Sequence, residues 1–167
     1  MRLTVWRFLA VVLVALSMGL SMCHLFEMSA RLSWEPAFWM AVTNPPNLLY
    51  RNFGTVGAFV DVAAWVSAVV LALLVRRRPG FRWAAIGAVL MVVAHAGWWT
   101  FVFPMNLAMA DWHAGTVPAN FLAVRNQWEY AHAAIAILKL LGLAALVASV
   151  LAETSAHPIG GDRTAEE

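Results

Sequence analysis

The stretch WEYAHAAIAILKLLGLAALVASVL, residues 128–151, decides the fold class of this chain. Its length suits a membrane-spanning helix, which needs about 20 mainly apolar residues. The apolar side chains do not alternate with polar ones every second residue, so a helix is predicted rather than a strand of a membrane barrel. Three ionisable side chains interrupt the run, at Glu129, His132 and Lys139, and they direct the search for function.

Three further stretches, 3–25, 54–75 and 82–103, are long and apolar enough to cross a bilayer. Hydrophobic residues make up 62% of the 167 residues, and 12% are charged, against roughly 25% charged in an ordinary soluble domain. This composition excludes a soluble enzyme and a disordered regulator. We therefore predict an all-α integral membrane four-helix bundle over residues 1–152, with a flexible cytoplasmic tail at 153–167.

The arginines predict how the chain crosses the membrane. Cytoplasmic segments are enriched in Lys and Arg, and more arginines flank one side of the four spans than the other. The richer side has Arg2, Arg7, Arg76, Arg77, Arg78 and Arg82, and the poorer side has Arg31, Arg51 and Arg125. We predict a multi-pass protein of the cell membrane with both termini cytoplasmic and two long outward-facing connections, 26–53 and 104–127. No basic patch is dense enough for a nucleic-acid partner.

Ionisable residues occur in every predicted span, although such groups are costly at membrane depth and usually functional. A helix rises 1.5 Å per residue, and counting from the outer span ends places six of these groups within about two turns of one another. We predict that they converge on one site in the outer half of the bundle. They are His24, Glu27, Asp61, His95, Glu129 and His132.

The spacing of these residues indicates a metal site. Glu-x-x-His is the pattern with which four-helix bundles present a carboxylate and an imidazole to a metal pair. Glu129 and His132 have this spacing, and His24 and Glu27 have it in reverse. Nitrogen and oxygen donors without a thiolate cluster suit iron, manganese or zinc. We predict iron first, with metal ligands His24, Asp61, His95 and His132, and with Glu27 and Glu129 as bridging ligands or acid–base groups.

Other interpretations of the same residues stay open. His95 could hold haem b together with His24 or His132, packed by Trp98 and Trp99. The imidazoles and carboxylates could also act as acid–base groups without a cofactor.

Each carboxylate also has a purely structural interpretation. Glu129 could pair with Arg125, and Asp61 with Arg51 or Arg31. Lys139 lies about 10 Å deeper than His132. No carboxylate of another span is expected at that depth. Ser17 and Ser67 are candidate partners of Lys139, which could line a polar cavity or snorkel inward.

The segment Phe101–Asn106 (FVFPMN), followed by Trp112 and then Trp128, resembles the anthrone oxygenase-like family of small four-span membrane proteins. In that family the third span ends in an apolar-x-Pro-apolar-Asn motif. The fourth opens with a Trp followed by Asn and, four residues after the Trp, Arg. This chain has Glu129 and His132 at those two positions. The motifs cover the last two spans, and the first two agree by hydropathy alone.

The resemblance implies oxidation of a hydrophobic polycyclic or phenolic substrate, with oxygen as the oxidant. Pro104, Asn106 and Trp128 carry over from the family motif. We predict a membrane oxidoreductase or monooxygenase acting on a lipophilic aromatic substrate at the metal site, with Asn106, Trp128 and Trp98 binding the substrate. The alternative is a non-catalytic haem- or quinone-binding anchor subunit of a larger complex. The sequence leaves open a homo-oligomer or a partner subunit.

Overall fold

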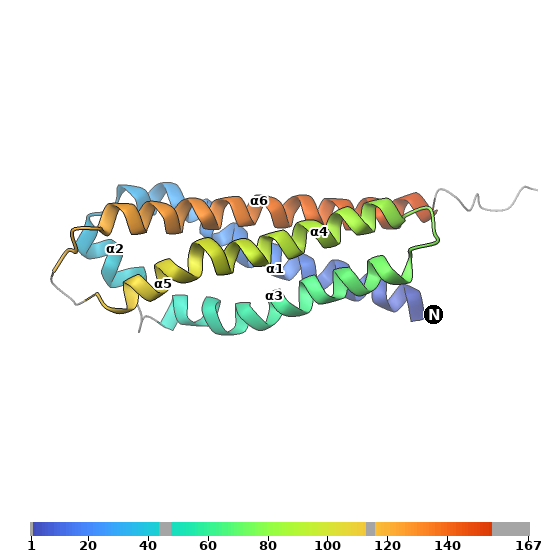
Figure 1. The fold of residues 1–167 in the computed structure, drawn as a ribbon, viewed down its shortest axis with the longest axis horizontal. Coiled ribbons are helices and arrows are strands. Elements are labelled where there is room, and N and C mark those ends of the chain that lie inside the picture. The colour runs from blue at the N-terminus through green and yellow to red at the C-terminus, as the bar shows by residue number, and fades with distance from the viewer. Residues whose placement is uncertain (1, 44–47, 113–115, 155–167) are drawn as a thin grey trace, which may run out of the picture.

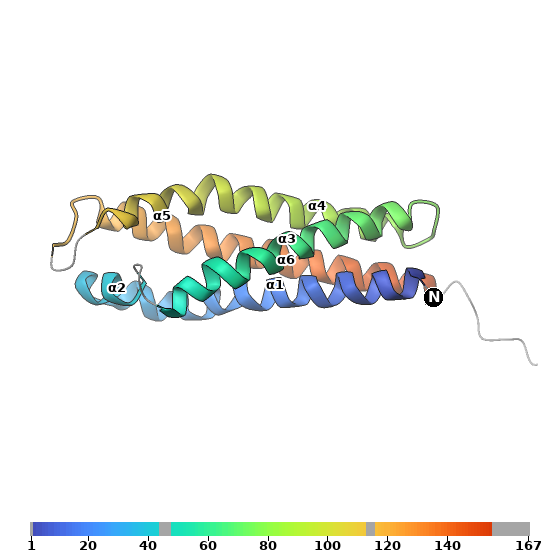
Figure 2. The ribbon, with the colours of Figure 1, turned by 90° about the horizontal axis from the view of Figure 1, so that it is seen from below.

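The computed structural model describes residues 2–43, 48–112 and 116–154, and its regular structure is helical throughout these ranges. Four long rods run along a common axis (Figures 1 and 2). The first, second and fourth rods are α1 (Arg2–Ser33), α3 (Leu48–Leu74) and α6 (Phe121–Thr154). The third joins α4 (Phe81–Gly97), η1 (Trp98–Val102) and α5 (Phe103–Ala110), and the short α2 (Pro36–Thr43) follows α1. All four rods are long and apolar enough to cross a membrane, which confirms the all-α membrane bundle.

The rods form a ring in the order α1, α3, α4, α6. Helix α6 packs against α1 and α4, and α3 packs against the same two helices from the other side. The N-terminus, the turn between α3 and α4 and the last turn of α6 lie at one end of the bundle (Figure 1). Helix α2 and the connection between α5 and α6 lie at the opposite end, which we call the α2 end.

The helices extend further than the apolar runs predicted. Helix α1 continues to Ser33 rather than to residue 25, the third rod reaches Ala110 rather than residue 103, and α6 begins at Phe121 rather than at Trp128. The connections predicted at 26–53 and 104–127 are therefore largely helical. Hydropathy marks only the apolar part of a helix, and it misses turns whose polar side chains are buried against one another.

The third rod passes through Pro104 instead of ending there. Proline removes a backbone donor and clashes with the carbonyl four residues earlier. The chain accommodates it with a π-turn, in which the Phe103 N–H donates to the Trp98 carbonyl five residues back. Such wide turns are frequent at functional sites. Here the turn carries Trp98 and Trp99, which both line a cavity described below.

The last turn of α6 joins the fold at the terminal end. Glu153 forms ion pairs with Arg7 of α1 and with Arg78, whose Nη1 lies 3.4 Å from Glu153 Oε2. The prediction that residue 153 belongs to a flexible tail is wrong, because Glu153 is buried and belongs to α6. Residues 155–167 of that prediction lie outside the described residues.

Helices α4 and α6 approach closely where both carry glycine. A Cβ added at Gly87 would lie 2.8 Å from Leu146 Cδ2 and 3.0 Å from the Gly142 carbonyl oxygen. Small residues let membrane helices bring their backbones together, and dispersion contacts then hold the pair. This crossing sets the position of α6, which supplies more of the residues discussed below than any other helix.

We expect Gly87→Val to lower the free energy of unfolding by about 1–3 kcal/mol, because the new side chain overfills a packed contact. Gly19→Val is the matched control, since nothing lies within 4 Å of a Cβ added there. Thermal unfolding of both variants in detergent measures the difference. Equal losses at the two glycines would show that the α4–α6 crossing is not tightly packed.

Candidate functional site

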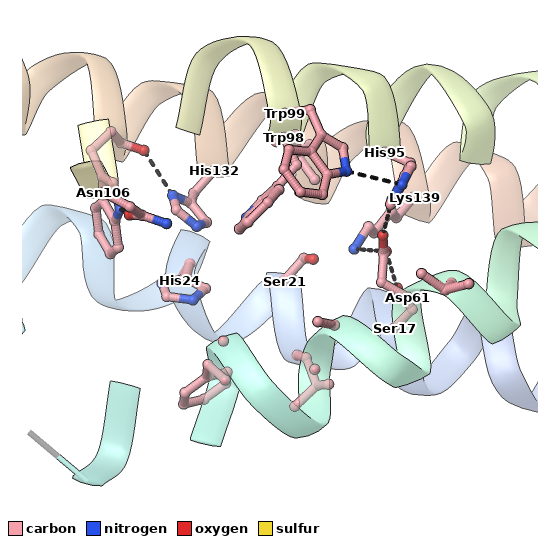
Figure 3. Close-up of a pocket in the computed structure, with 18 of the residues that line it drawn as sticks. Ser17, Ser21, His24, Asp61, His95, Trp98, Trp99, Asn106, His132 and Lys139 are labelled. Carbon is pink, nitrogen blue, oxygen red and sulfur yellow. Dashed lines mark hydrogen bonds and ion pairs between the residues drawn. The ribbon is translucent and has the colours of Figure 1, made fainter. Parts of the chain in front are cut away.

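A cavity of about 520 Å³ lies among all four rods and extends from the α2 end toward the middle of the bundle. Its wall is mainly apolar, with polar groups at two places (Figure 3). The cavity brings together most of the site residues that the sequence predicts. Those lining it are His24, Asp61, His95, Trp98, Asn106, Trp128 and His132.

Two imidazoles face each other at the α2 end of the cavity. The ring centroids of His24 in α1 and His132 in α6 are 4.3 Å apart, and the Trp128 ring lies 4.2 Å from that of His132. His132 Nδ1 is 2.9 Å from the Trp128 carbonyl oxygen. A carbonyl only accepts, so Nδ1 donates and the neutral ring keeps its lone pair on Nε2. His132 thus presents an unprotonated acceptor nitrogen in a largely apolar space.

Asn106 and Trp128 are joined directly. Trp128 Nε1 donates to Asn106 Oδ1 over 2.8 Å, which links α5 to α6 beside the imidazole pair. These two residues belong to the motifs on which the family resemblance rests. The bond fixes the indole plane, because it uses the only donor of that ring. Trp128 therefore forms a rigid wall of the cavity.

The second polar place is centred on Asp61 of α3. Asp61 Oδ1 lies 2.6 Å from Lys139 Nζ and accepts a hydrogen bond from Ser17 Oγ at 2.9 Å, while Oδ2 lies 2.7 Å from His95 Nδ1. Trp99 Nε1 donates to His95 Nε2 over 3.2 Å. Because Nε2 accepts, Nδ1 carries the proton and donates to Asp61. We call Ser17, Asp61, His95 and Lys139 the Asp61 cluster.

The Asp61 cluster corrects what the sequence predicted for Lys139. A carboxylate does lie at the depth of Lys139, since Asp61 is its ion-pair partner. The depth of Asp61 was counted from Gly54, but α3 begins at Leu48, so Asp61 lies further along the helix. Helical side chains also lean toward the N-terminus of their helix, which carries the Lys139 ammonium toward Asp61. The predicted pairs of Asp61 with Arg51 or Arg31 do not form among the described contacts.

The two glutamates lie outside the cavity, around Arg31 near the end of α1. Arg31 and Glu129 are both buried, and they form a bidentate pair, with Nε to Oε1 at 2.8 Å and Nη2 to Oε2 at 2.6 Å. Arg31 also donates to Glu27 at 2.7 Å and to the His24 carbonyl at 2.8 Å. Trp39 Nε1 of α2 donates to Glu129 at 3.0 Å.

Arg31 is the residue that sequence reasoning missed, because it counted only as a charge in a connection. The spacing offered a signal, since Glu27 and Arg31 are four residues apart on one helix face. Glu129 accepts from three donors, so the geometry makes it the counterion of Arg31 rather than a bridging ligand. The predicted pair of Glu129 with Arg125 is wrong, because Arg125 donates to Asn126 and to the Leu32 carbonyl instead.

The predicted metal donors do not assemble into one centre. Within the described ranges, no group of three or more His, Cys, Asp or Glu side chains could hold a metal ion. The donors separate into the imidazole pair, the Asp61 cluster and the glutamates on Arg31. Structural metal sites use about four ligands and catalytic ones about three protein ligands. Metal ligation thus stays a prediction that this donor arrangement does not favour.

Haem between the two facing imidazoles fits no better. An iron bonded to a nitrogen of each ring at about 2 Å would put the ring centroids roughly 6 Å apart. The observed separation of His24 and His132 is 4.3 Å. His95 uses both ring nitrogens, one toward Asp61 and the other toward Trp99. The arrangement of these three histidines therefore does not fit a haem held between two imidazoles.

No family model, curated protein or solved structure matches this chain. The resemblance to the anthrone oxygenase-like family rests on the motifs around Pro104, Asn106 and Trp128, and it stays a prediction.

We expect Arg31→Met to lower the free energy of unfolding by about 3–5 kcal/mol, because it leaves the buried Glu129 carboxylate without its counterion. The control is Arg125→Met. That arginine is half-buried, donates to the uncharged acceptors of Asn126 and Leu32 and lies 5.4 Å from the centre of the Phe121 ring. Its loss removes the counterion of no carboxylate among the described contacts, so about 1–2 kcal/mol is expected. Thermal unfolding in detergent compares the two variants. If they lose stability equally, the Arg31–Glu129 pair does not hold the α2 end together.

Proposed function

We propose that this chain is a membrane oxidoreductase or oxygenase that takes a lipophilic phenolic or other aromatic substrate into the cavity. One observation carries the proposal: His132, held by its bond to the Trp128 carbonyl, offers an unprotonated Nε2 to a mainly apolar cavity. A base in such a place suits the removal of a proton from a substrate that is itself apolar. General bases of this kind accelerate reactions by about 10²–10⁴-fold.

The size and walls of the cavity support an aromatic substrate. Small-molecule sites have volumes of about 300–1,000 Å³ and are lined mainly by apolar and aromatic side chains with a few polar groups. The cavity, at about 520 Å³, falls within that range. Trp98 and Trp128 both line the cavity, and contacts between aromatic rings favour a flat aromatic ligand over a flexible chain of the same area. A two- or three-ring molecule therefore fits best.

The chemistry needs a base and an oxidant. Removal of a proton makes a conjugated aromatic substrate electron-rich, so that it can reduce dioxygen, the oxidant that the family resemblance implies. For a methylene between two rings, both C–H bonds and the O–O bond break. One oxygen atom becomes the carbonyl oxygen of the product, and the other leaves as water with the two hydrogens. His132 would accept the first proton and return it to the departing oxygen.

We further propose that the α2 end faces outward and that both termini are cytoplasmic. The arginine-rich turn between α3 and α4 and the N-terminus share one end of the bundle (Figure 1). The positive-inside rule then assigns that end to the cytoplasm. The cavity accordingly lies in the outer half of the membrane.

His132→Asn tests the proposed base. The asparagine amide can replace Nδ1 as a donor to the Trp128 carbonyl, but it cannot accept a proton. We expect turnover to fall about 10²–10⁴-fold, with little change in thermal unfolding. Oxygen uptake with anthrone as the test substrate measures turnover in nanodiscs. Near-normal uptake in this variant would refute the role of His132, and elemental analysis of the same samples shows whether His132 binds metal.

Reporter fusions test the orientation. We expect reporters placed after Arg78 and after residue 167 both to give cytoplasmic signals, and a reporter inserted at residue 114 to give an outside signal. The reversed pattern would move the cavity to the cytoplasmic half of the membrane while leaving the fold unchanged.

A further inference from the structure

Lys139, the ion-pair partner of Asp61, also faces the cavity as one of its lining residues. Its side chain is 8% exposed, and it lines the cavity near the middle of the bundle. An ammonium group carries three N–H donors. Among the described residues, the ion-pair partner of Lys139 is Asp61, whose Oδ1 lies 2.6 Å from Lys139 Nζ. A buried ammonium with donors to spare is costly in an apolar surrounding, unless something else accepts from it.

Most of the hydrogen-bond acceptor capacity of the Asp61 carboxylate is already used within the cluster. Its two oxygens receive Lys139, Ser17 and the Nδ1–H of His95. His95 in turn accepts from Trp99 at Nε2. The Asp61 cluster is therefore neutral overall, with one negative carboxylate, one positive ammonium and a neutral imidazole. The hydrogen-bonding capacity that the described contacts of the cluster leave unused includes two N–H donors of Lys139, which lines the cavity.

The α2 end of the cavity offers a hydrogen-bond acceptor instead of a donor. His132 presents Nε2 as an acceptor, because its Nδ1 donates to the Trp128 carbonyl. In Figure 3 the ring of Trp98 lies between the imidazole pair and the Asp61 cluster. A ligand lying along this cavity would meet an acceptor at one end, an aromatic face in the middle and a donor at the other end.

We propose that Lys139 is a second binding group of the cavity, which receives an acceptor oxygen of the ligand while a hydroxyl at the ligand's other end bonds to His132. This inference rests on the proposed function only in placing a ligand in the cavity. It adds a ligand class, which is a flat lipophilic molecule with a carbonyl oxygen at one end and a hydroxyl at the other.

The spacing along α6 limits the ligand's length. His132 and Lys139 are seven residues apart, or about 10 Å along the helix axis. The side chains of His132 and Lys139 both lean toward the N-terminus of α6, so this axial spacing sets the scale of the distance between the two polar groups. Two fused six-membered rings with substituents at opposite ends have a length comparable to this spacing. The carbonyl would then sit beside the ammonium. The ammonium also stabilises negative charge that develops on that oxygen when the other end of a conjugated ligand, a hydroxyl or the methylene of the oxidation proposed above, loses a proton to His132.

A pair of matched probes tests the role of Lys139. 6-Acetyl-2-naphthol has a hydroxyl at one end and a carbonyl at the other, and 6-isopropenyl-2-naphthol has the same shape without the acceptor oxygen. Binding of both to the full chain in nanodiscs is followed by their fluorescence. A charge-assisted hydrogen bond favours the acetyl compound by roughly 10- to 100-fold, and we expect that preference in the wild type.

Two variants remove the ammonium. Lys139→Met leaves Asp61 without its counterion, so the double variant Asp61→Asn with Lys139→Met removes both charges and keeps the cluster neutral. We expect the preference for the acetyl probe to fall to about onefold in both. The control is Ser67→Ala, a buried polar residue of α3 outside the cavity, and it should keep the wild-type preference.

The inference is overturned if the wild type binds the two probes equally, if it binds neither, or if the preference survives in the neutral double variant. Failure of the proposed function gives a different result. Selective binding through Lys139 without oxygen uptake would retain the binding group and refute the oxidation. Oxygen uptake with no preference between the probes would retain the oxidation and refute the binding role of Lys139.

Discussion

The buried pair of Arg31 and Glu129 is the interaction on which the rest of the structure depends. A charge within an apolar bundle must be neutralised and hydrogen-bonded, because its desolvation costs several kcal/mol. Arg31 meets this requirement with two carboxylates and a backbone carbonyl, and its guanidinium also lies 5.4 Å from the centre of the Trp128 ring. The pair therefore ties α1 to α6, and Trp39 adds α2. It brings His24 and Trp128, one on each helix, to the same end of the cavity.

The need to neutralise buried charge also separates the charged groups that hold the fold together from the groups that can act on a ligand. Both glutamates pair with Arg31, and Asp61 accepts from three donors, so each of these carboxylates has a structural partner. The imidazole of His132 differs, because its neutral form is stable without a counterion. The groups that remain for a ligand are thus a neutral acceptor at one end and the surplus donors of a paired ammonium at the other. Both can meet a ligand without adding net charge to the bundle.

Sequence alone predicted the four helices, because each carries a long apolar run that only a bilayer accommodates. It also placed His24, Asp61, His95 and His132 around one cavity, since residues at similar depth in a narrow bundle have few other places to point. The sequence did not predict the ion pairs that form between two helices, such as Arg31 with Glu129. Whether Glu129 turns to Arg125 on its own helix or to Arg31 on another depends on helix rotation, which hydropathy does not fix. The partner of Lys139 was also predicted wrongly, because α3 begins at Leu48 and not at residue 54, which changes the depth of Asp61.

The π-turn at Trp98–Val102 also determines how the two halves of the third span are rotated. It holds one more residue than an α-helical turn, and each residue of an α-helix corresponds to about 100° of rotation. If the turn became regular α-helix without a change of length, α5 would rotate by about that angle relative to α4. His95 would stay beside Asp61, while Asn106 would swing away from Trp128. A single turn of backbone therefore acts as a rotational joint between the two ends of the cavity.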